Sequence, residues 1–136
     1  VHMVVQLFNI LYIPDILDHL ISIFEKECST FPGDVSTIAM TPIWSPHLFN
    51  LTGAPDIVKA VAINRLEYWL ANHEHDEHVM RIFSVGTFDM ILAQLREPTD
   101  PNRRQRVLDY SKFLDQNKSA TLENKIPELY RLLMVE

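Results

Sequence analysis

A short phrase recurs four times along this chain and limits the folds that the chain can adopt. Each copy opens with an apolar residue, which is usually followed by a proline. An acidic residue comes next, and then apolar residues at helical spacing. The copies begin at Ile13, Ala54, Phe88 and Ile126, at steps of 41, 34 and 38 residues. A helix-starting phrase at a period of about 34–47 residues is typical of stacked α-helical repeats. Such stacks bury a continuous core and present a surface to partners. The pattern therefore predicts an all-α chain that works by binding.

The size and composition of the chain are consistent with one domain, spanning residues 1–136. The length of 136 residues suits a single core, and 47% of the residues are hydrophobic. The formal charge of −6 argues against nucleic-acid binding, because phosphate contacts need a basic surface. No apolar run has the ~18–20 residues that a membrane helix needs, so no membrane association is expected. A single cysteine and the lack of a secretory signal favour an intracellular chain in the cytoplasm, with the nucleus left open.

The first half of the chain shows helical periodicity on both sides of an interruption. The apolar stretch from Met3 to Tyr12 is expected to be helical, and Pro14 is expected to open a second helix, where its missing N–H costs nothing. Residues 29–54, with their turn residues and prolines, are expected to form an irregular connection. The strongest helix is expected over Asp56 to Asn72, with an apolar surface so wide that neighbours must cover more than one side. Residues Ile57, Ala60, Ile63 and Tyr68 are expected to extend that surface.

The second half predicts further helices with recognisable ends, for a total of about 6–7. Thr87 is the expected N-cap of one helix, and Asp100 is the expected cap of the next, with Pro101 at its first position. The last helix is expected to begin at Ile126 or Pro127 and to run to the end of the chain. It remains apolar without a capping residue, which suggests that it packs against a partner or a further segment.

The stretch from Ala60 to Leu95 resembles an armadillo repeat. It has a long helix with a terminal Leu-x-Asn turn, a short polar link, a valine-rich half-turn, a glycine and a packing helix. Residues 101–133 repeat this scheme. The short step from 54 to 88 also fits the two-helix pairs of HEAT repeats. The resemblance implies a right-handed superhelical stack whose packing helices line a concave groove for a peptide or a partner domain. The polar positions that it places in that groove are Asp89, Gln94, Arg96, Glu128 and Arg131.

Two aromatic residues in the irregular connection are a second candidate surface. Trp44 and Phe49 lie in a proline-rich loop, where large apolar side chains can form an exposed anchor for a partner. They join the five polar positions as predicted partner-binding residues.

The densest cluster of titratable side chains is the run from His73 to His78. Imidazoles and carboxylates at this density are able to bind Zn²⁺, and His73, His75 and His78 are the candidate ligands. The run follows a long helix in an all-α chain, so a solvated turn is the interpretation we favour.

Cys28 follows an acidic helix, which disfavours a reactive thiolate. The three glycines are too scattered for a phosphate-binding loop. The residues therefore predict neither an enzyme nor a bound cofactor.

Three hypotheses for function follow from these patterns. The favoured one is a non-catalytic protein-interaction scaffold or adaptor, which binds a peptide or helical partner through the concave face of a short helical-repeat stack. A small regulatory domain that binds metal through the histidine cluster is an alternative. Homo-oligomerisation through the apolar last helix is another, in which Leu133 would lie at the interface between copies.

Overall fold

The computed structural model describes residues 2–27, 38–43, 49–84, 86–116 and 121–135, and most of them are helical. The predicted helical class is therefore confirmed, whereas the superhelical repeat stack stays a prediction. The elements follow in the order β1 (His2–Val5), η1 (Ile10–Tyr12), α1 (Ile13–Glu27), β2 (Ala39–Pro42), η3 (Leu51–Gly53), α2 (Asp56–His73), α3 (Glu77–Met80), α4 (Thr87–Arg96), α5 (Pro101–Gln116), α6 (Leu122–Lys125) and α7 (Pro127–Met134).

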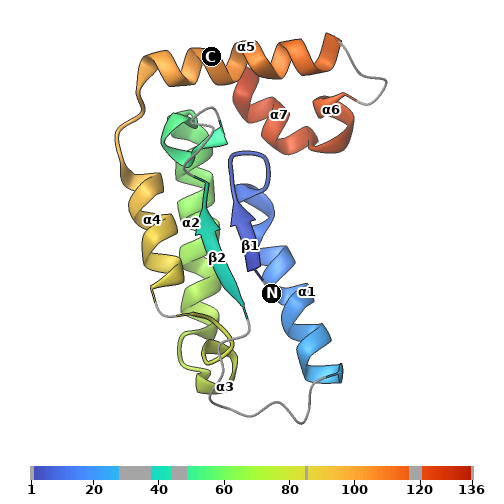
Figure 1. Ribbon diagram of the computed structural model, residues 1–136, viewed down its shortest axis with the longest axis vertical. Helices are drawn as coiled ribbons and strands as arrows, with labels where there is room; N and C mark the ends of the chain where they lie inside the picture. The colour runs from blue at the N-terminus through green and yellow to red at the C-terminus, as the bar shows by residue number, and fades with distance from the viewer. Residues whose placement is uncertain (1, 28–37, 44–48, 85, 117–120, 136) are drawn as a thin grey trace.

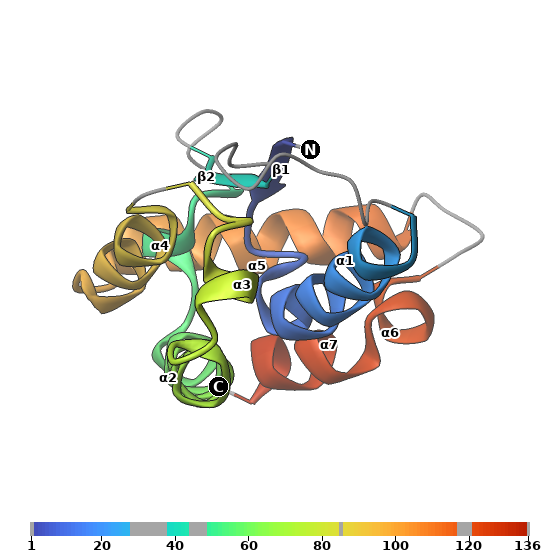
Figure 2. The ribbon, with the colours of Figure 1, turned by 90° about the horizontal axis from the view of Figure 1, so that it is seen from below.

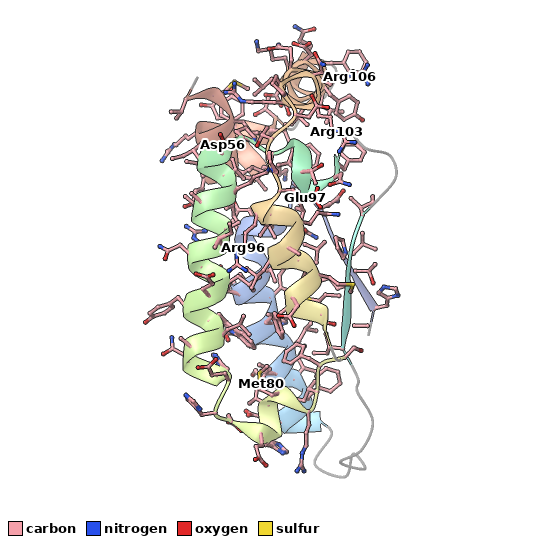
Figure 3. The ribbon with its side chains drawn as sticks, turned by 90° about the vertical axis from the view of Figure 1, so that its left-hand side faces the viewer. Asp56, Met80, Arg96, Glu97, Arg103 and Arg106 are labelled. Atoms are coloured by element: carbon pink, nitrogen blue, oxygen red, sulfur yellow. The ribbon has the colours of Figure 1, made fainter. Side chains whose placement is uncertain are left out.

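Helix α2 is the longest element and organises the rest of the molecule (Figure 1). Helix α4 lies beside it, with Asp56 and Glu97 near one end of the pair and Met80 near the other (Figure 3). Helix α5 crosses one end of the molecule. Figure 2 shows the two strands on one side and α2 with α7 on the other, with α1 and α4 between them. Segments distant in the chain therefore meet along α2.

The buried face of α2 forms much of the core. Val58, Ala62, Leu66 and Trp69 are buried along it, and α1, η1, α4 and α7 all contact the helix. The prediction that neighbours cover α2 on more than one side is confirmed. The predicted extension of the apolar surface is wrong for three of its four residues: Ile63 is partly buried against the core, whereas Ile57, Ala60 and Tyr68 are exposed. Their positions turn away from the packed face and towards solvent.

Three aromatic rings pack together where α2, α3 and α4 meet. The Trp69 ring centroid lies 5.7 Å from that of Phe83 and 5.6 Å from that of Phe88, and the two phenylalanine rings are 5.2 Å apart. Edge-to-face and offset pairs at these separations add to the stability that burial provides. This cluster holds the far end of α2 against the start of α4.

The predicted helix over Met3 to Tyr12 is wrong. Its first residues form β1, which pairs in parallel with β2 so that Met3 lies opposite Met40, and η1 follows. The side chain of Asn9 enforces the turn between them, because its Oδ1 accepts from the Gln6 N–H at 2.8 Å and its Nδ2 donates to the Val4 carbonyl at 2.8 Å. A short, nearly continuous apolar run shows neither the two-residue period of a strand nor the 3.6-residue period of a helix, so pattern alone does not separate the two.

Residues 29–54 are more ordered than predicted in the part that the structure describes. Strand β2 and helix η3 both lie in this segment. Asn50, which is buried, accepts the Thr52 N–H at 2.9 Å and so caps η3. The backbone of Ile38 also bridges in parallel to Phe83, which ties the segment to the approach to α4.

Several helices begin where the sequence predicts, and one does not. Pro127 occupies the first turn of α7, and Asp100 caps α5 by accepting the Asn102 N–H at 2.9 Å. Helix α4, by contrast, is preceded by Gly86 at φ 76° and begins at Thr87, so the predicted N-cap is wrong by one residue. Glycine adopts this left-handed conformation without the steric cost that a Cβ brings. The short helix α6 was not predicted.

Helix α7 packs into its own chain. Leu129 and Leu133 are fully buried, and the helix contacts α2 and α6. The expectation that Leu133 lies at an interface between copies is therefore wrong, because its apolar surface is used within the fold.

Among the helices of the described segments, none has both the length and the apolar character to cross a membrane.

Candidate functional site

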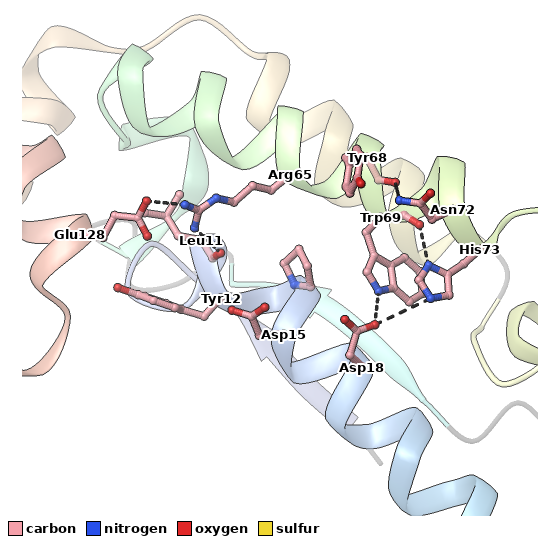
Figure 4. A pocket seen from close by; sticks show the side chains of 11 residues that line it. Leu11, Tyr12, Asp15, Asp18, Arg65, Tyr68, Trp69, Asn72, His73 and Glu128 are labelled. Carbon is pink, nitrogen blue, oxygen red and sulfur yellow. Dashed lines mark hydrogen bonds and ion pairs between the residues drawn. The ribbon is translucent and has the colours of Figure 1, made fainter.

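The candidate site is a groove between α1 and α2, with a volume of about 480 Å³ (Figure 4). This volume is in the range of known ligand sites, which is about 300–1,000 Å³. The residues that line the groove are Leu11, Tyr12, Pro14, Asp15, Asp18, Arg65, Tyr68, Trp69, Asn72, His73 and Glu128.

Helical geometry produces the two walls of the groove. One wall carries Tyr12, Asp15 and Asp18, which follow each other at intervals of three residues. The other carries Arg65, Tyr68 and Asn72, at intervals of three and four. Residues at these spacings lie on one face of a helix, about 5–6 Å apart at Cβ. Each helix therefore presents a row of polar and aromatic side chains to the other (Figure 4).

One end of the groove is closed by an ion pair from the C-terminal part of the chain. The Arg65 guanidinium donates from Nη2 to Oε1 of Glu128 on α7, and from Nη1 to the Leu11 carbonyl at 3.1 Å. The two paired side chains are 37% and 45% exposed, so solvent screens their attraction. Arg65 is the one arginine or lysine among the described lining residues, and its contacts hold α7 beside η1.

The other end of the groove is formed by Asp18, Trp69 and His73. The Trp69 indole N–H donates to Oδ1 of Asp18 at 2.7 Å, and the His73 ring stacks on the indole with centroids 4.1 Å apart. His73 Nδ1 lies 2.8 Å from the Trp69 carbonyl. A carbonyl only accepts, so Nδ1 carries the proton there. Nε2 faces Asp18 at 3.8 Å.

Two side chains in the middle of the groove remain open to a ligand. Asp15 is exposed and has no hydrogen-bond or ion-pair partner within the described segments. Tyr68 is 73% exposed, which is unusual for a large aromatic side chain. In Figure 4 both lie between the two satisfied ends.

The predicted groove residues on α4 do not form a surface together. Asp89 is exposed, whereas Gln94 is only 2% exposed, and its side-chain amide has no hydrogen-bond partner among the described residues. Arg96 forms an ion pair with Glu67 of α2. The prediction that Gln94 contacts a partner is wrong, because this side of α4 packs against the rest of the chain.

The predicted residues on α7 lie elsewhere. Glu128 lines the groove between α1 and α2, and Arg131 is exposed on the same helix. Helices α4 and α7 contact different sides of α2, so their polar positions do not line one concave face. Packing around α2 therefore separates residues that the repeat resemblance had placed together.

The predicted aromatic anchor is only partly described. Trp44 falls outside the described residues. Phe49 is half-buried, with its ring 5.6 Å from that of Phe8 and 5.5 Å from that of Tyr110. Its ring is thus used in internal packing between the N-terminal segment and α5.

The three candidate metal ligands are not brought together. His73 ends α2 and stacks on Trp69, whereas the His75 side chain is 90% exposed. His78 is exposed in α3. Over the residues that the structure describes, no group of three or more His, Cys, Asp or Glu side chains is placed to hold a metal ion. Residues 74–78 are all exposed, which agrees with the predicted solvated turn.

A buried lysine lies away from the groove, beside η3. Lys59 is 4% exposed, and its Nζ donates to the carbonyls of Thr52 and Glu97 at 2.9 and 2.8 Å and to Oγ1 of Thr99 at 2.8 Å. Burial lowers the pKa of its ammonium from the ordinary value of 10.5, while the Asp56 and Glu97 carboxylates oppose that change. All three donors are used within the chain, which gives Lys59 a structural role.

The sequence patterns did not point to Asp15, Asp18 or Arg65 as site residues, and they placed Tyr68 on the apolar surface of its helix. The signal that was available is the spacing of three residues from Tyr12 to Asp18 and from Arg65 to Tyr68. That spacing shows two polar rows but not that they face each other.

No protein-family model, curated protein or solved structure matches this chain. The armadillo- or HEAT-like resemblance therefore stays a prediction, and the groove has to be interpreted from its own chemistry.

Proposed function

We propose that this chain is a non-catalytic protein-interaction module that binds a peptide segment in the groove between α1 and α2. The observation that carries the proposal is that Tyr68 and Asp15 are both exposed in a groove of about 480 Å³, and that Asp15 has no polar partner among the described residues. Tyrosine is enriched among the residues that dominate binding energy at protein interfaces. The proposal does not depend on a right-handed repeat stack, which remains a prediction along with the intracellular location.

The chemistry of the groove supports binding better than catalysis. Among the described residues of its lining, the hydroxyl groups are the phenols of Tyr12 and Tyr68, and no serine, threonine or cysteine occurs. His73 is engaged with the Trp69 carbonyl and the indole face. A nucleophile–base pair needs the two side chains within hydrogen-bond reach, and no such pair lies in this lining.

The walls of the groove are also suited to hold a ligand with little rearrangement. The Arg65 pair and the Trp69 hydrogen bond with Asp18 each join an α2 side chain to a segment on the opposite wall or end. A preorganised site spends less free energy on ordering its side chains when the ligand binds.

Selection from a random-peptide phage library, followed by binding measurements with single variants, tests this proposal. Tyr68→Ala removes an exposed ring, so the fold should survive, and Phe113→Ala is the matched control because it removes an exposed aromatic ring from α5. We expect the selected peptides to bind wild type and Phe113→Ala equally and Tyr68→Ala at least about ten-fold more weakly, which corresponds to about 1.4 kcal/mol.

Two results would overturn the proposal. Selected peptides that bind Tyr68→Ala as tightly as wild type would place the binding surface elsewhere, and a selection that yields no binder would remove the evidence for peptide recognition. Circular dichroism of each variant ensures that a loss of binding reflects the groove and not unfolding.

A further inference from the structure

We infer that the groove between α1 and α2 recognises an arginine side chain of a basic peptide segment. This inference rests on the proposed function and specifies its partner. The decisive residues are Asp15 and Asp18, which lie three positions apart on the same face of α1 and line the groove. The phenol rings of Tyr12 and Tyr68 lie in the same groove (Figure 4).

The charge of the groove favours a cation. Three carboxylates line it, from Asp15, Asp18 and Glu128, and Arg65 neutralises only the last of them. The other two carboxylates have no Arg or Lys partner among the described residues of the lining. The formal charge of the whole chain is −6, which adds a long-range attraction for a basic partner. An acidic segment would meet repulsion from the same groups.

Guanidinium geometry fits the spacing of the two acids. Residues at i and i+3 have Cβ atoms about 5–6 Å apart on a helix, so a planar group with several donors can reach both carboxylates. Asp18 already accepts the Trp69 indole N–H through Oδ1, which leaves Oδ2 available to a ligand. Arginine presents five N–H donors in a fixed plane, whereas lysine offers a single compact ammonium.

The aromatic side chains complete the proposed site. A guanidinium within about 6 Å of a tyrosine ring is attracted by the negative potential of the ring face. Tyr68 at 73% exposure keeps its ring accessible at the rim. The indole N–H of Trp69 and the Nδ2 of Asn72 are instead used within the chain, since the first donates to Asp18 and the second to the Tyr68 carbonyl at 3.0 Å. Both side chains contribute shape to the groove, and Trp69 also joins α2 to α1.

The test uses immobilised peptide pools with one fixed central residue, flanked by random positions of Gly, Ser, Ala, Leu and Pro. The fixed residue is arginine, lysine, leucine, glutamate or citrulline, which has the shape of arginine without its charge. Retention of the labelled full chain on each pool is measured, and affinities for individual retained peptides follow from fluorescence polarisation at two salt concentrations. We expect retention in the order arginine, then lysine, with the other three pools at background. Affinity should fall as salt screens the charges.

An isosteric double variant, Asp15→Asn/Asp18→Asn, removes both charges from the groove. The amide oxygen at position 18 can still accept the Trp69 N–H, so the contact between α1 and α2 is kept. The matched control is Asp89→Asn, because Asp89 is an exposed aspartate in the first turn of α4 just as Asp15 is in the first turn of α1. We expect the double variant to bind the arginine peptides at least ten-fold more weakly and the control to bind them as wild type does.

The outcomes separate this inference from the proposed function. Retention of the leucine, glutamate or citrulline pools as strong as that of the arginine pool, with loss on Tyr68→Ala, would overturn the arginine inference and support peptide binding in the groove. Retention of the arginine pool that is unchanged in the double variant would overturn the site. Retention of no pool by the folded wild-type chain would overturn both proposals.

Discussion

Replacing Lys59 with methionine should destabilise the fold, although the substitution removes a buried charge. Lys59 joins three segments, because its ammonium donates to the Thr52 carbonyl of η3, to the Glu97 carbonyl at the end of α4, and to the Thr99 hydroxyl before α5. Methionine fills a similar space but offers no donor. The three acceptors then lose their partner at the same time.

The magnitude depends on which acceptors water can reach. Thr52 is buried, and leaving its carbonyl without a donor costs about 1–3 kcal/mol. Glu97 is exposed and Thr99 is half-buried, so water can replace the donor there, and each lost bond costs about 0.5–1.5 kcal/mol. Removing the desolvated ammonium offsets part of this loss, so we expect a net decrease of about 2–3 kcal/mol in the free energy of unfolding.

Equilibrium unfolding in urea at pH 7, followed by far-ultraviolet circular dichroism, measures this difference. Lys112→Met is the control, since Lys112 is an exposed lysine of α5, and it should change stability by less than about 0.5 kcal/mol. A Lys59→Met variant as stable as the control would refute the reasoning, because it would show that burial of the charge costs as much as its three hydrogen bonds contribute.

The pH dependence of the same pair of proteins gives an independent check. The pKa of Lys59 is lowered in the folded chain, so between that pKa and the ordinary value of 10.5 the unfolded chain holds a proton that the folded chain has lost. Stability rises with pH wherever the unfolded state binds more protons. The stability of wild type relative to Lys59→Met should therefore increase as pH rises through this window, and a flat or falling difference would contradict the burial of the ammonium.

Three further substitutions test the packing. Gln94→Met should raise the free energy of unfolding by about 1–2 kcal/mol in urea, because the buried amide has no hydrogen-bond partner among the described residues; a decrease would reveal a hydrogen bond that the amide makes. Gly86→Ala should cost about 1 kcal/mol from the positive φ alone, since the added methyl group has no described atom within 4 Å apart from its chain neighbours; an unchanged thermal midpoint would argue against that conformation. Leu133→Ala should cost about 2–4 kcal/mol and leave the mass measured by sedimentation unchanged; a change in mass without loss of stability would restore the interface hypothesis.

The sequence was sufficient to predict features that depend only on interactions between residues close together in the chain. Pro127 in the first turn of α7 and Asp100 before α5 act on backbone groups within a few residues, so their roles could be predicted from neighbours alone. The burial of Trp69 was also predictable, because it lies on the apolar stripe of α2. The pattern failed over Met3 to Val5, where pairing with residues 39–42 decides between strand and helix.

The candidate site required information that no local pattern contains. Asp18 and Trp69 are 51 positions apart, yet one hydrogen bond of 2.7 Å joins them across the groove. Gln94 is polar and lies on an amphipathic helix, but the side on which neighbouring elements pack decides that it is buried. Hydrophobic periodicity specifies that a helix has an inner face, without specifying which other face it meets.

The sequence by itself therefore determined the helical class, the positions of most helix starts and the apolar face of α2, because backbone capping and side-chain periodicity act over one or two turns. Only the tertiary structure decided that Tyr12, Asp15 and Asp18 face Arg65 and Tyr68, and that α4 and α7 lie on different sides of α2. The physical reason is that burial is non-directional and depends on the total apolar area removed from water, so the pairing of faces emerges only when the whole core packs.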